Sequence, residues 1–137
     1  GHAYVLADRS VRLSPEGWAA TVAKAGREFG ADRVVAERNY GGAMVESVLR
    51  AAEITLPIKL VTASRGKVIR AEPIAALYEQ GRVHHVGAFP ELEEQMTMTT
   101  TTGYQGSGSP DRMDALVWAL TELMLGNAPY NLAALAG

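Results

Sequence analysis

Short apolar runs alternate with amphipathic helical segments along this chain, and this alternation constrains the fold more than any other feature. Apolar runs bounded by polar or glycine residues are typical of buried strands, whereas apolar residues spaced three and four apart indicate helices. Strands that alternate with helices predict an α/β fold with a mostly parallel central sheet. The predicted strands cover residues 4–7, 33–37, 57–63 and 83–86.

Local signals predict where the helices begin. Ser14 and Pro15 are typical of a helix start, and Gly30 of the end of that helix. A second helix is expected after Gly41-Gly42, a short one from Pro73, and the last and strongest one from Ser109-Pro110-Asp111.

The remaining segments are expected to be irregular. Residues 64–70 form a predicted basic loop, and residues 87–109 a longer Thr- and Gly-rich loop. The strand at 83–86 is then the final one. We expect one domain over residues 1–126 and a poorly ordered tail over residues 127–137.

Composition excludes several classes of protein. The chain has 137 residues, no Cys and a net charge of −2, so a disulfide scaffold, a thiolate zinc site and a Cys nucleophile are excluded. No apolar run approaches the ~18 residues of a membrane span, and no leader is expected. A Cys-free domain fits the cytosol. A near-neutral charge means that any nucleic-acid contact needs a local basic patch.

Glu37 is the first candidate for chemistry, because it ends an otherwise apolar strand. Ligands of open α/β sheets gather at the carboxyl ends of the strands. A carboxylate at such a position is costly unless it is solvated, paired or bound to metal. The alternative to a functional role is a structural ion pair with Arg38 or Arg33.

Two further acids lie at the start of the last helix. Asp111 is in its first turn, and Asp114 follows one turn later on the same face. Asp111 is either functional or an acid that the helix dipole favours at this end. Asp114 is either a second functional acid or a solvated residue on the outer face.

Carboxylates that converge from a strand end and a helix start suit Mg²⁺ or Mn²⁺, which prefer oxygen ligands. Two such ions about 3.5–4 Å apart activate water and stabilise the leaving oxygen in phosphodiester cleavage. Neither a phosphate-binding loop nor a nucleophile-elbow motif is present, which argues against ATPase and serine-hydrolase activity.

Basic residues gather after the third strand, where Arg65, Lys67 and Arg70 are close in sequence. They form either a patch that contacts a nucleic-acid backbone or an ordinary solvated loop. His84 and His85 are adjacent on a strand and therefore face opposite sides, so they are not expected to share a metal ion.

Three segments in this order and spacing resemble one known family. They are residues 33–42 (RVVAERNYGG), 64–74 (SRGKVIRAEPI) and 107–120 (SGSPDRMDALVWAL). Together they are similar to the C-terminal nuclease domain of the large terminase subunit of tailed bacteriophages and prophages. The resemblance covers about the first 125 residues. It implies a ribonuclease H-like fold, a mixed sheet flanked by helices.

The resemblance also implies an activity and its residues. The family cuts concatemeric double-stranded DNA during genome packaging, with two divalent ions (Mg²⁺ or Mn²⁺) held by three acids. Glu37 matches the family's strand-end acid and Asp111 its helix-start acid, although Pro110 stands where many relatives have another acid. Asp114 matches a frequent acid one turn on. Lys67 and Arg70 match basic positions that the resemblance implies face DNA.

One departure from the family concerns the first metal-binding acid. That acid lies on the family's first strand, whereas Tyr4 resembles the second strand, so we expect the first strand to be missing from this chain. Asp8 is a weak candidate to substitute for it. The implied partners in the full protein are an ATPase motor domain, the small terminase subunit and the portal, in the cytoplasm of the bacterial host.

Two alternatives to the packaging nuclease stay open. One is another ribonuclease H-like nuclease, of the junction resolvase type, which prefers branched DNA. The other is a non-catalytic DNA-binding or assembly module that retains the fold without metal binding.

Overall fold

The computed structural model describes residues 1–38, 42–53, 55–126 and 132–135 of the chain. Its helices and strands alternate as expected, and the predicted α/β class is confirmed. In chain order they are β1 (Ala3–Val5), α1 (Pro15–Phe29), β2 (Arg33–Glu37), α2 (Gly42–Ala52), β3 (Ile58–Val61), α3 (Lys67–Glu79), β4 (Val83–His85), α4 (Pro90–Thr97), β5 (Thr99–Thr100), β6 (Gly103–Tyr104), α5 (Asp111–Leu120), the π-helical turn η1 (Thr121–Leu125) and β7 (Leu132–Leu135).

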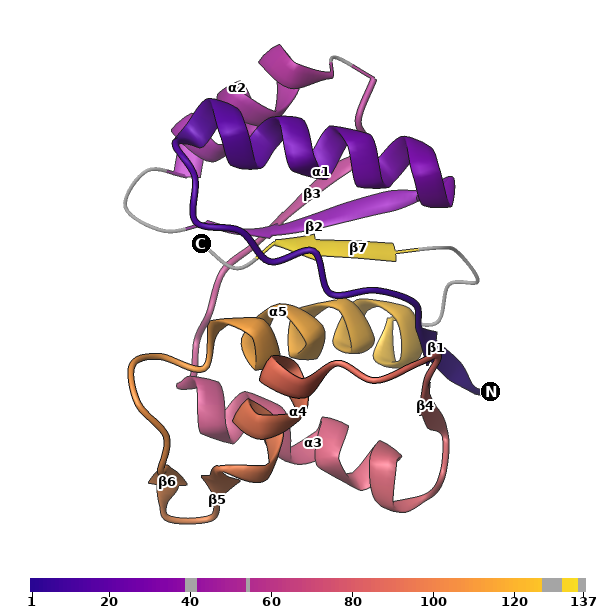
Figure 1. Cartoon of the computed structure of the whole chain (residues 1–137), viewed down its shortest axis with the longest axis vertical. Helices are drawn as coiled ribbons and strands as arrows, with labels where there is room; N and C mark the ends of the chain where they lie inside the picture. Colours follow the sequence, from indigo (N-terminus) through magenta and orange to yellow (C-terminus); the bar gives the residue numbers. More distant parts are fainter. Residues whose placement is uncertain (39–41, 54, 127–131, 136–137) are drawn as a thin grey trace.

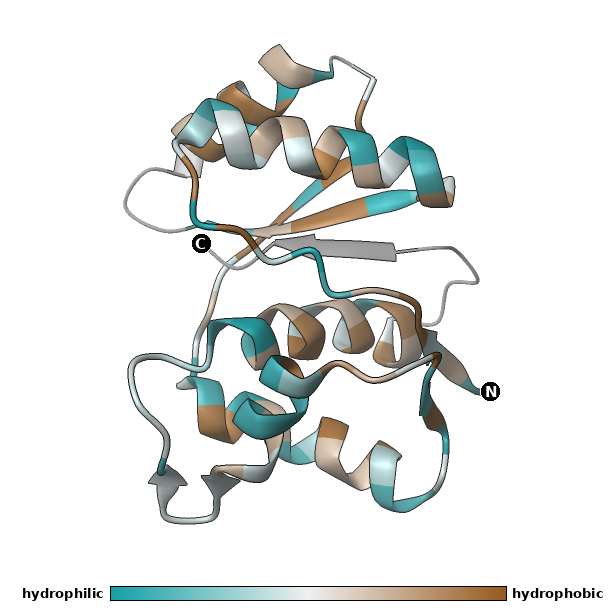
Figure 2. Cartoon of the chain, viewed as in Figure 1, coloured by the Kyte–Doolittle hydropathy of each residue, from teal (hydrophilic) through white to brown (hydrophobic). Residues whose placement is uncertain are grey.

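A parallel three-stranded sheet lies in the middle of the molecule, in the order β3-β2-β7 (Figure 1). Helices α1 and α2 cover one face, and α5 lies along the other (Figure 1). The central strand β2 is apolar along most of its length (Figure 2). Val34, Val35 and Ala36 are all buried, as expected for a strand covered on both faces.

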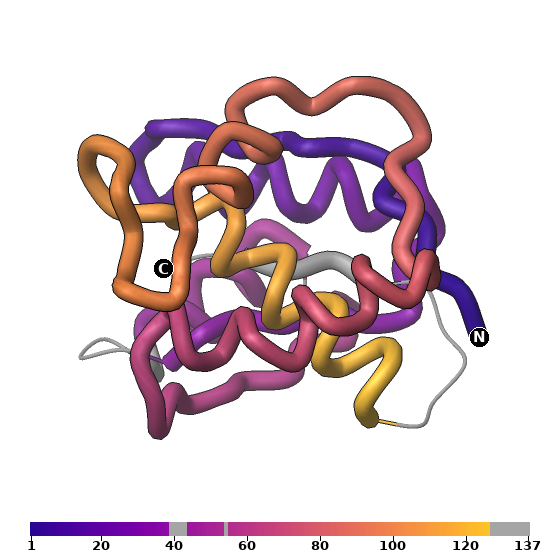
Figure 3. The backbone as a smooth tube through the Cα atoms, turned by 90° about the horizontal axis from the view of Figure 1, so that it is seen from below, coloured from indigo at the N-terminus to yellow at the C-terminus, as the bar shows by residue number. Residues whose placement is uncertain are grey.

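Helix α5 is surrounded on its other sides by the remaining elements. Seen from below, it runs between α3 and the segment that contains α4 and the short β5–β6 hairpin (Figure 3). Strands β1 and β4 form a separate parallel pair in which Tyr4 lies opposite His84. Beyond α5, Glu122 of η1 contacts Lys59 of β3 at 2.6 Å and Arg33 of β2 at 3.5 Å, which attaches this end of the helix to the sheet.

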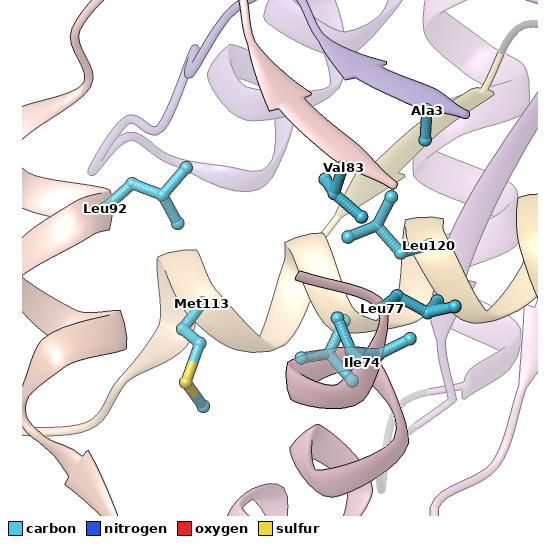
Figure 4. Close-up of a cluster of buried hydrophobic side chains, with 8 residues drawn as sticks. Ala3, Ile74, Leu77, Val83, Leu92, Met113 and Leu120 are labelled. Atoms are coloured by element: carbon cyan, nitrogen blue, oxygen red, sulfur yellow. The ribbon is translucent and has the colours of Figure 1, made fainter. Parts of the chain in front are cut away.

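Most of the buried apolar side chains in the described part of the chain form two cores. The first core lies between the sheet and helices α1 and α2. Its residues are Ala19, Ala23, Val34, Ala36, Val45, Leu49 and Leu56. The second core lies among α3, α4, α5 and the β1–β4 pair (Figure 4). Its residues are Ala3, Ile74, Leu77, Val83, Leu92, Met113, Val117 and Leu120.

The first helix and the second strand agree closely with expectation. Ser14 caps α1 by accepting a hydrogen bond from the backbone N–H of Gly17, and Pro15 is its first residue. Gly30 ends the helix in the left-handed conformation (φ +58°), which glycine adopts without steric cost. The predicted strand over residues 33–37 is β2, residue for residue. Gly41, which we expected at the start of α2, lies outside the described residues.

The expectation of a loop was right for residues 64–66 but wrong for residues 67–70, and the expected helix start at Pro73 was also wrong. Helix α3 begins at Lys67, so Lys67 and Arg70 are helical and Pro73 lies inside the helix. Proline there removes one hydrogen bond from the helix. The helix continues through it because Ile74 and Leu77 are buried in the second core on the far side of Pro73.

Two other expectations were also wrong. Residues 87–109 contain α4 and the β5–β6 hairpin rather than one loop. Helix α4 begins with proline followed by acidic residues, as α1 does, and Leu92 anchors it in the second core. The strand at 83–86 is not the last one, because residues 132–135 of the expected tail form β7 beside β2. The other tail residues, 127–131 and 136–137, lie outside the described part.

Candidate functional site

Glu37 lies at the carboxyl end of β2, where the sheet meets helices α3 and α5. Its backbone is paired in register with Val61 of β3, and the N–H of Arg38 donates to the Val61 carbonyl at 2.6 Å. The Glu37 side chain is 17% exposed. A parallel ladder on β2 thus holds a largely buried carboxylate at the edge of the sheet.

The first turn of α3 carries two basic side chains toward the acids. Lys67 and Arg70 are three residues apart and share one face of the helix. Asp111 and Asp114 have the same spacing on α5, which packs against α3. Basic residues of α3 therefore pair with acidic residues of α5 at two successive turns, Lys67 with Asp111 and Arg70 with Asp114.

Arg70 is engaged on every side. Its Nη1 and Nη2 donate to the two carboxylate oxygens of Asp114 at 2.6 and 3.4 Å, and its Nε donates to the carbonyl of Arg65 at 2.9 Å. The guanidinium carbon lies 4.7 Å from the centre of the Trp118 ring. Nη2 is also 3.9 Å from Oε1 of Glu37. Arg70 thereby joins α3, α5 and the end of β2.

Asp114 is fully buried (0% exposed), so the alternative of a solvated outer position was wrong. A carboxylate that water cannot reach needs a close cationic partner, and Arg70 donates to both oxygens of Asp114. Arg70 itself is only 13% exposed. Its guanidinium contacts Asp114 and the Trp118 ring, whereas Arg65 is exposed. The assignment of Arg65, Lys67 and Arg70 to DNA binding stays a prediction.

Asp111 is the most exposed of the candidate site acids, with a side chain 57% exposed. Lys67 Nζ lies 2.5 Å from its Oδ1, and the hydroxyl of Ser109 donates to the same oxygen at 2.8 Å. Partial burial raises the pKa of Asp111, but the hydrogen bonds from Lys67 and Ser109 outweigh it and hold the pKa below the usual value. Asp111 is therefore ionised at neutral pH.

Asp8, the weak candidate for the first acid, contacts a different part of α5. Its carboxylate accepts hydrogen bonds from the backbone and hydroxyl of Ser10 and from Arg112 at 2.9 Å. Burial raises its pKa, but these hydrogen bonds together lower it below the usual value. Asp8 is thus engaged by its own loop and by the neighbour of Asp111.

The histidines have separate partners, as neighbouring strand residues do. His84 stacks with the rings of His2 and Tyr4, at centroid distances of 5.1 and 5.0 Å. His85 is hydrogen-bonded to the Tyr78 hydroxyl and to Glu93.

Glu37 and Asp111 have the donor chemistry for a hard divalent cation. Mg²⁺ is commonly bound through one or two carboxylates, with water and substrate phosphate completing its shell. Among residues 1–38, 42–53, 55–126 and 132–135, no three His, Cys, Asp or Glu side chains form a cluster that could hold a metal ion. The described residues therefore do not by themselves form a three-acid, two-ion site.

A family model for the terminase RNaseH-like domain matches residues 1–123. The chain belongs to this family. The resemblance and fold inferred from the sequence are confirmed, and the terminase domain is of nuclease type. No curated protein and no solved structure gives a significant match to it. None of the helices in its described part combines the length and apolarity that a membrane span requires.

Sequence reasoning missed how the terminase domain holds its acids. It treated Ser109 only as a helix start, whereas Ser109 donates a hydrogen bond to Asp111. The Trp118 ring lies against the Arg70 guanidinium. The signal was the identical spacing of two basic and two acidic residues, Lys67 with Arg70 and Asp111 with Asp114. That pattern predicts two facing helices with paired charges.

Proposed function

We propose that this terminase domain is a divalent-metal-dependent endonuclease that cuts concatemeric double-stranded DNA during genome packaging. Glu37 and Asp111 are the proposed metal ligands, with Mg²⁺ or Mn²⁺ as the ion. Asp114 and Asp8, the other acids considered, are each held by an arginine. A two-ion arrangement would need a further carboxylate beyond Glu37 and Asp111.

The observation that carries the proposal is the junction of strand end and helix start. Arg70 lies beside Glu37 and pairs with Asp114, while Lys67, one turn away, pairs with Asp111. These contacts connect both acids to the first turn of α3. They support a shared site at the carboxyl end of β2, where α/β proteins commonly bind ligands. The family match supports a hydrolytic role for that edge.

The chain's own residues supply the surroundings of the reaction. A bound divalent ion would activate a water molecule and stabilise charge on the leaving oxygen. Lys67 and the exposed Arg65 flank Asp111 and the loop before α3, where they would contact DNA phosphates and position the duplex. Ser109 would orient the Asp111 carboxylate through its 2.8 Å hydrogen bond.

The wider setting of the activity follows from the terminase family. We place the domain beside an ATPase motor domain, with the small terminase subunit and the portal as partners. The proposed setting is the cytoplasm of an infected bacterial host.

Conversion of supercoiled plasmid to nicked and linear forms, measured with and without Mn²⁺, tests the proposal. Glu37→Gln and Asp111→Asn should each reduce the rate at least about 100-fold, because each removes a charged ligand. Glu79→Gln, at the exposed end of α3, is the matched control and should cut normally. Normal cutting by either ligand variant would contradict the assignment.

The same material separates the alternatives. A strong preference for branched over linear duplex would favour a resolvase-type nuclease. Salt-dependent DNA binding without any Mn²⁺ binding would favour a non-catalytic module.

A further inference from the structure

The proposed metal site assigns no role to Asp114. It is an acid on the same face of α5 as Asp111, yet it is fully buried and both its oxygens are bonded to Arg70. A carboxylate in this position has no open side toward solvent from which to bind a hydrated cation. Its role must therefore be exerted through Arg70.

Arg70 is held more tightly than an ordinary ion pair requires. Asp114 fixes both terminal nitrogens, the Arg65 carbonyl fixes Nε, and the Trp118 ring covers one face of the guanidinium. These contacts come from α5 and from the loop before α3, and together they allow the guanidinium one orientation. In that orientation Nη2 points to the end of β2.

The contact from Arg70 to Glu37 is electrostatic. At 3.9 Å, Nη2 and Oε1 form an ion pair but are too far apart for a hydrogen bond. Both side chains are largely buried (13% and 17% exposed), so solvent screens this attraction less than it would on the surface. Arg70 therefore sets where the Glu37 carboxylate rests while leaving it able to take another ligand.

We propose that Arg70 is a positioning residue for Glu37 and that Asp114 is the buried anchor that holds Arg70 in place. Asp114 then serves the reaction indirectly and binds no metal, and Arg70 contacts no DNA phosphate. This inference rests on the proposed function, because it assumes that Glu37 is a metal ligand. Groups that orient metal ligands typically contribute about 10- to 100-fold to metal affinity or activity.

The test measures Mn²⁺ affinity by titration calorimetry, the salt dependence of DNA affinity, and plasmid nicking. Arg70→Lys keeps the charge but loses the planar fork, and Asp114→Asn loses the anchoring charge. Each should weaken Mn²⁺ binding about 10-fold or more and lower kcat to match. KM for DNA and the salt slope of DNA binding should stay at native values.

A loss of fold has to be separated from a loss of positioning. Leu92→Ala removes a buried side chain from α4 and should lower stability without changing Mn²⁺ affinity. The double variant Arg70→Met/Asp114→Leu replaces the ion pair with apolar groups, which often restores stability. We expect it to recover the unfolding midpoint but not the Mn²⁺ affinity.

Each contrary result has a defined meaning. Native Mn²⁺ affinity in Arg70→Lys and the double variant would overturn the positioning role. If Asp114→Asn loses Mn²⁺ binding while Arg70→Lys keeps native affinity, Asp114 is itself a metal ligand and the positioning role is overturned. A smaller salt slope with native Mn²⁺ affinity in Arg70→Met/Asp114→Leu, which removes the Arg70 charge, would make Arg70 a DNA contact and overturn the proposal. If Glu37→Gln leaves Mn²⁺ affinity unchanged, the proposed function itself fails.

Discussion

Lys67 occupies the place beside Asp111 that an incoming cation would need, and this leads to a quantitative prediction. Its ammonium lies 2.5 Å from Asp111 Oδ1 and 2.9 Å from the Ser109 hydroxyl. Metal binding at Asp111 has to break or loosen this ion pair. Lys67→Met removes the competing charge, so the variant should bind Mn²⁺ more tightly than the native domain.

The exposure of the pair sets the size of the effect. Lys67 is 30% and Asp111 57% exposed, and ion pairs this open are worth about 0.2–1 kcal/mol. Removing that cost should lower the Kd for Mn²⁺ by about 1.4- to 5-fold at low ionic strength, and the gain should shrink as salt screens the native pair.

The loss of Mn²⁺ binding at low pH gives an independent check of this prediction. Lys67 helps to hold the pKa of Asp111 below its usual value. Without the lysine that pKa rises, protons compete with the metal at a higher pH, and Mn²⁺ binding should be lost earlier on acidification. Titration calorimetry from neutral pH down to below pH 3.8 measures both effects, because the pKa of Asp111 lies below that value in the native domain.

Lys24→Met is the matched control, because Lys24 is an exposed lysine on α1 and its loss changes the net charge equally. It should leave the Kd unchanged. If Lys67→Met binds Mn²⁺ more weakly than the native domain, Lys67 supports metal binding and the competition argument is wrong. An unchanged Kd would place the metal away from Asp111.

Two further predictions concern stability. Leu49 is fully buried in the first core, so Leu49→Ala should lower the free energy of unfolding, measured in urea titrations, by about 2–5 kcal/mol. Met44→Ala, on the exposed face of the same helix, should change it by less than about 0.5 kcal/mol. Equal losses in the two variants would contradict the burial argument. The folded-state pKa of Asp8 lies below the ordinary 3.8, so its hydrogen bonds stabilise the protein above pH 3.8 and that contribution is lost as the pH falls through the folded pKa. Asp8→Asn should therefore be less stable than the native domain at pH 7, and the difference in unfolding free energy should become smaller as the pH falls below 3.8. A difference that stays constant from pH 7 to below pH 3.8 would contradict the role given to the Asp8 carboxylate.

Local sequence signals predicted the elements whose ends carry strong caps. Ser14, Pro15 and Gly30 bound α1, and the uniform apolar character of residues 33–37 identified β2. Pro73 misled the prediction of α3, since proline usually begins a helix. Tertiary burial of Ile74 and Leu77 decided that case, and no local pattern encodes it.

Long-range pairing explains the other differences. Residues 132–135 carry no strong strand signal of their own, and they form β7 because β2 offers a parallel edge about a hundred residues earlier in the chain. Within the site, the strand-end rule selected Glu37 correctly as a residue at the sheet edge. The pairing of Arg70 with Asp114 depends on how α3 packs on α5, which the sequence indicates only through matched spacing.

The division of the interior into two cores has a consequence for how the domain opens. Glu37 extends from a strand of the first core, whereas Asp111 and Asp114 belong to a helix of the second. Regions with separate packing open as separate cooperative units, each with its own free energy. Opening either unit separates the carboxylates before the whole chain unfolds. Mild denaturant should therefore abolish metal binding while the backbone amides of the unit that stays closed remain protected from hydrogen exchange.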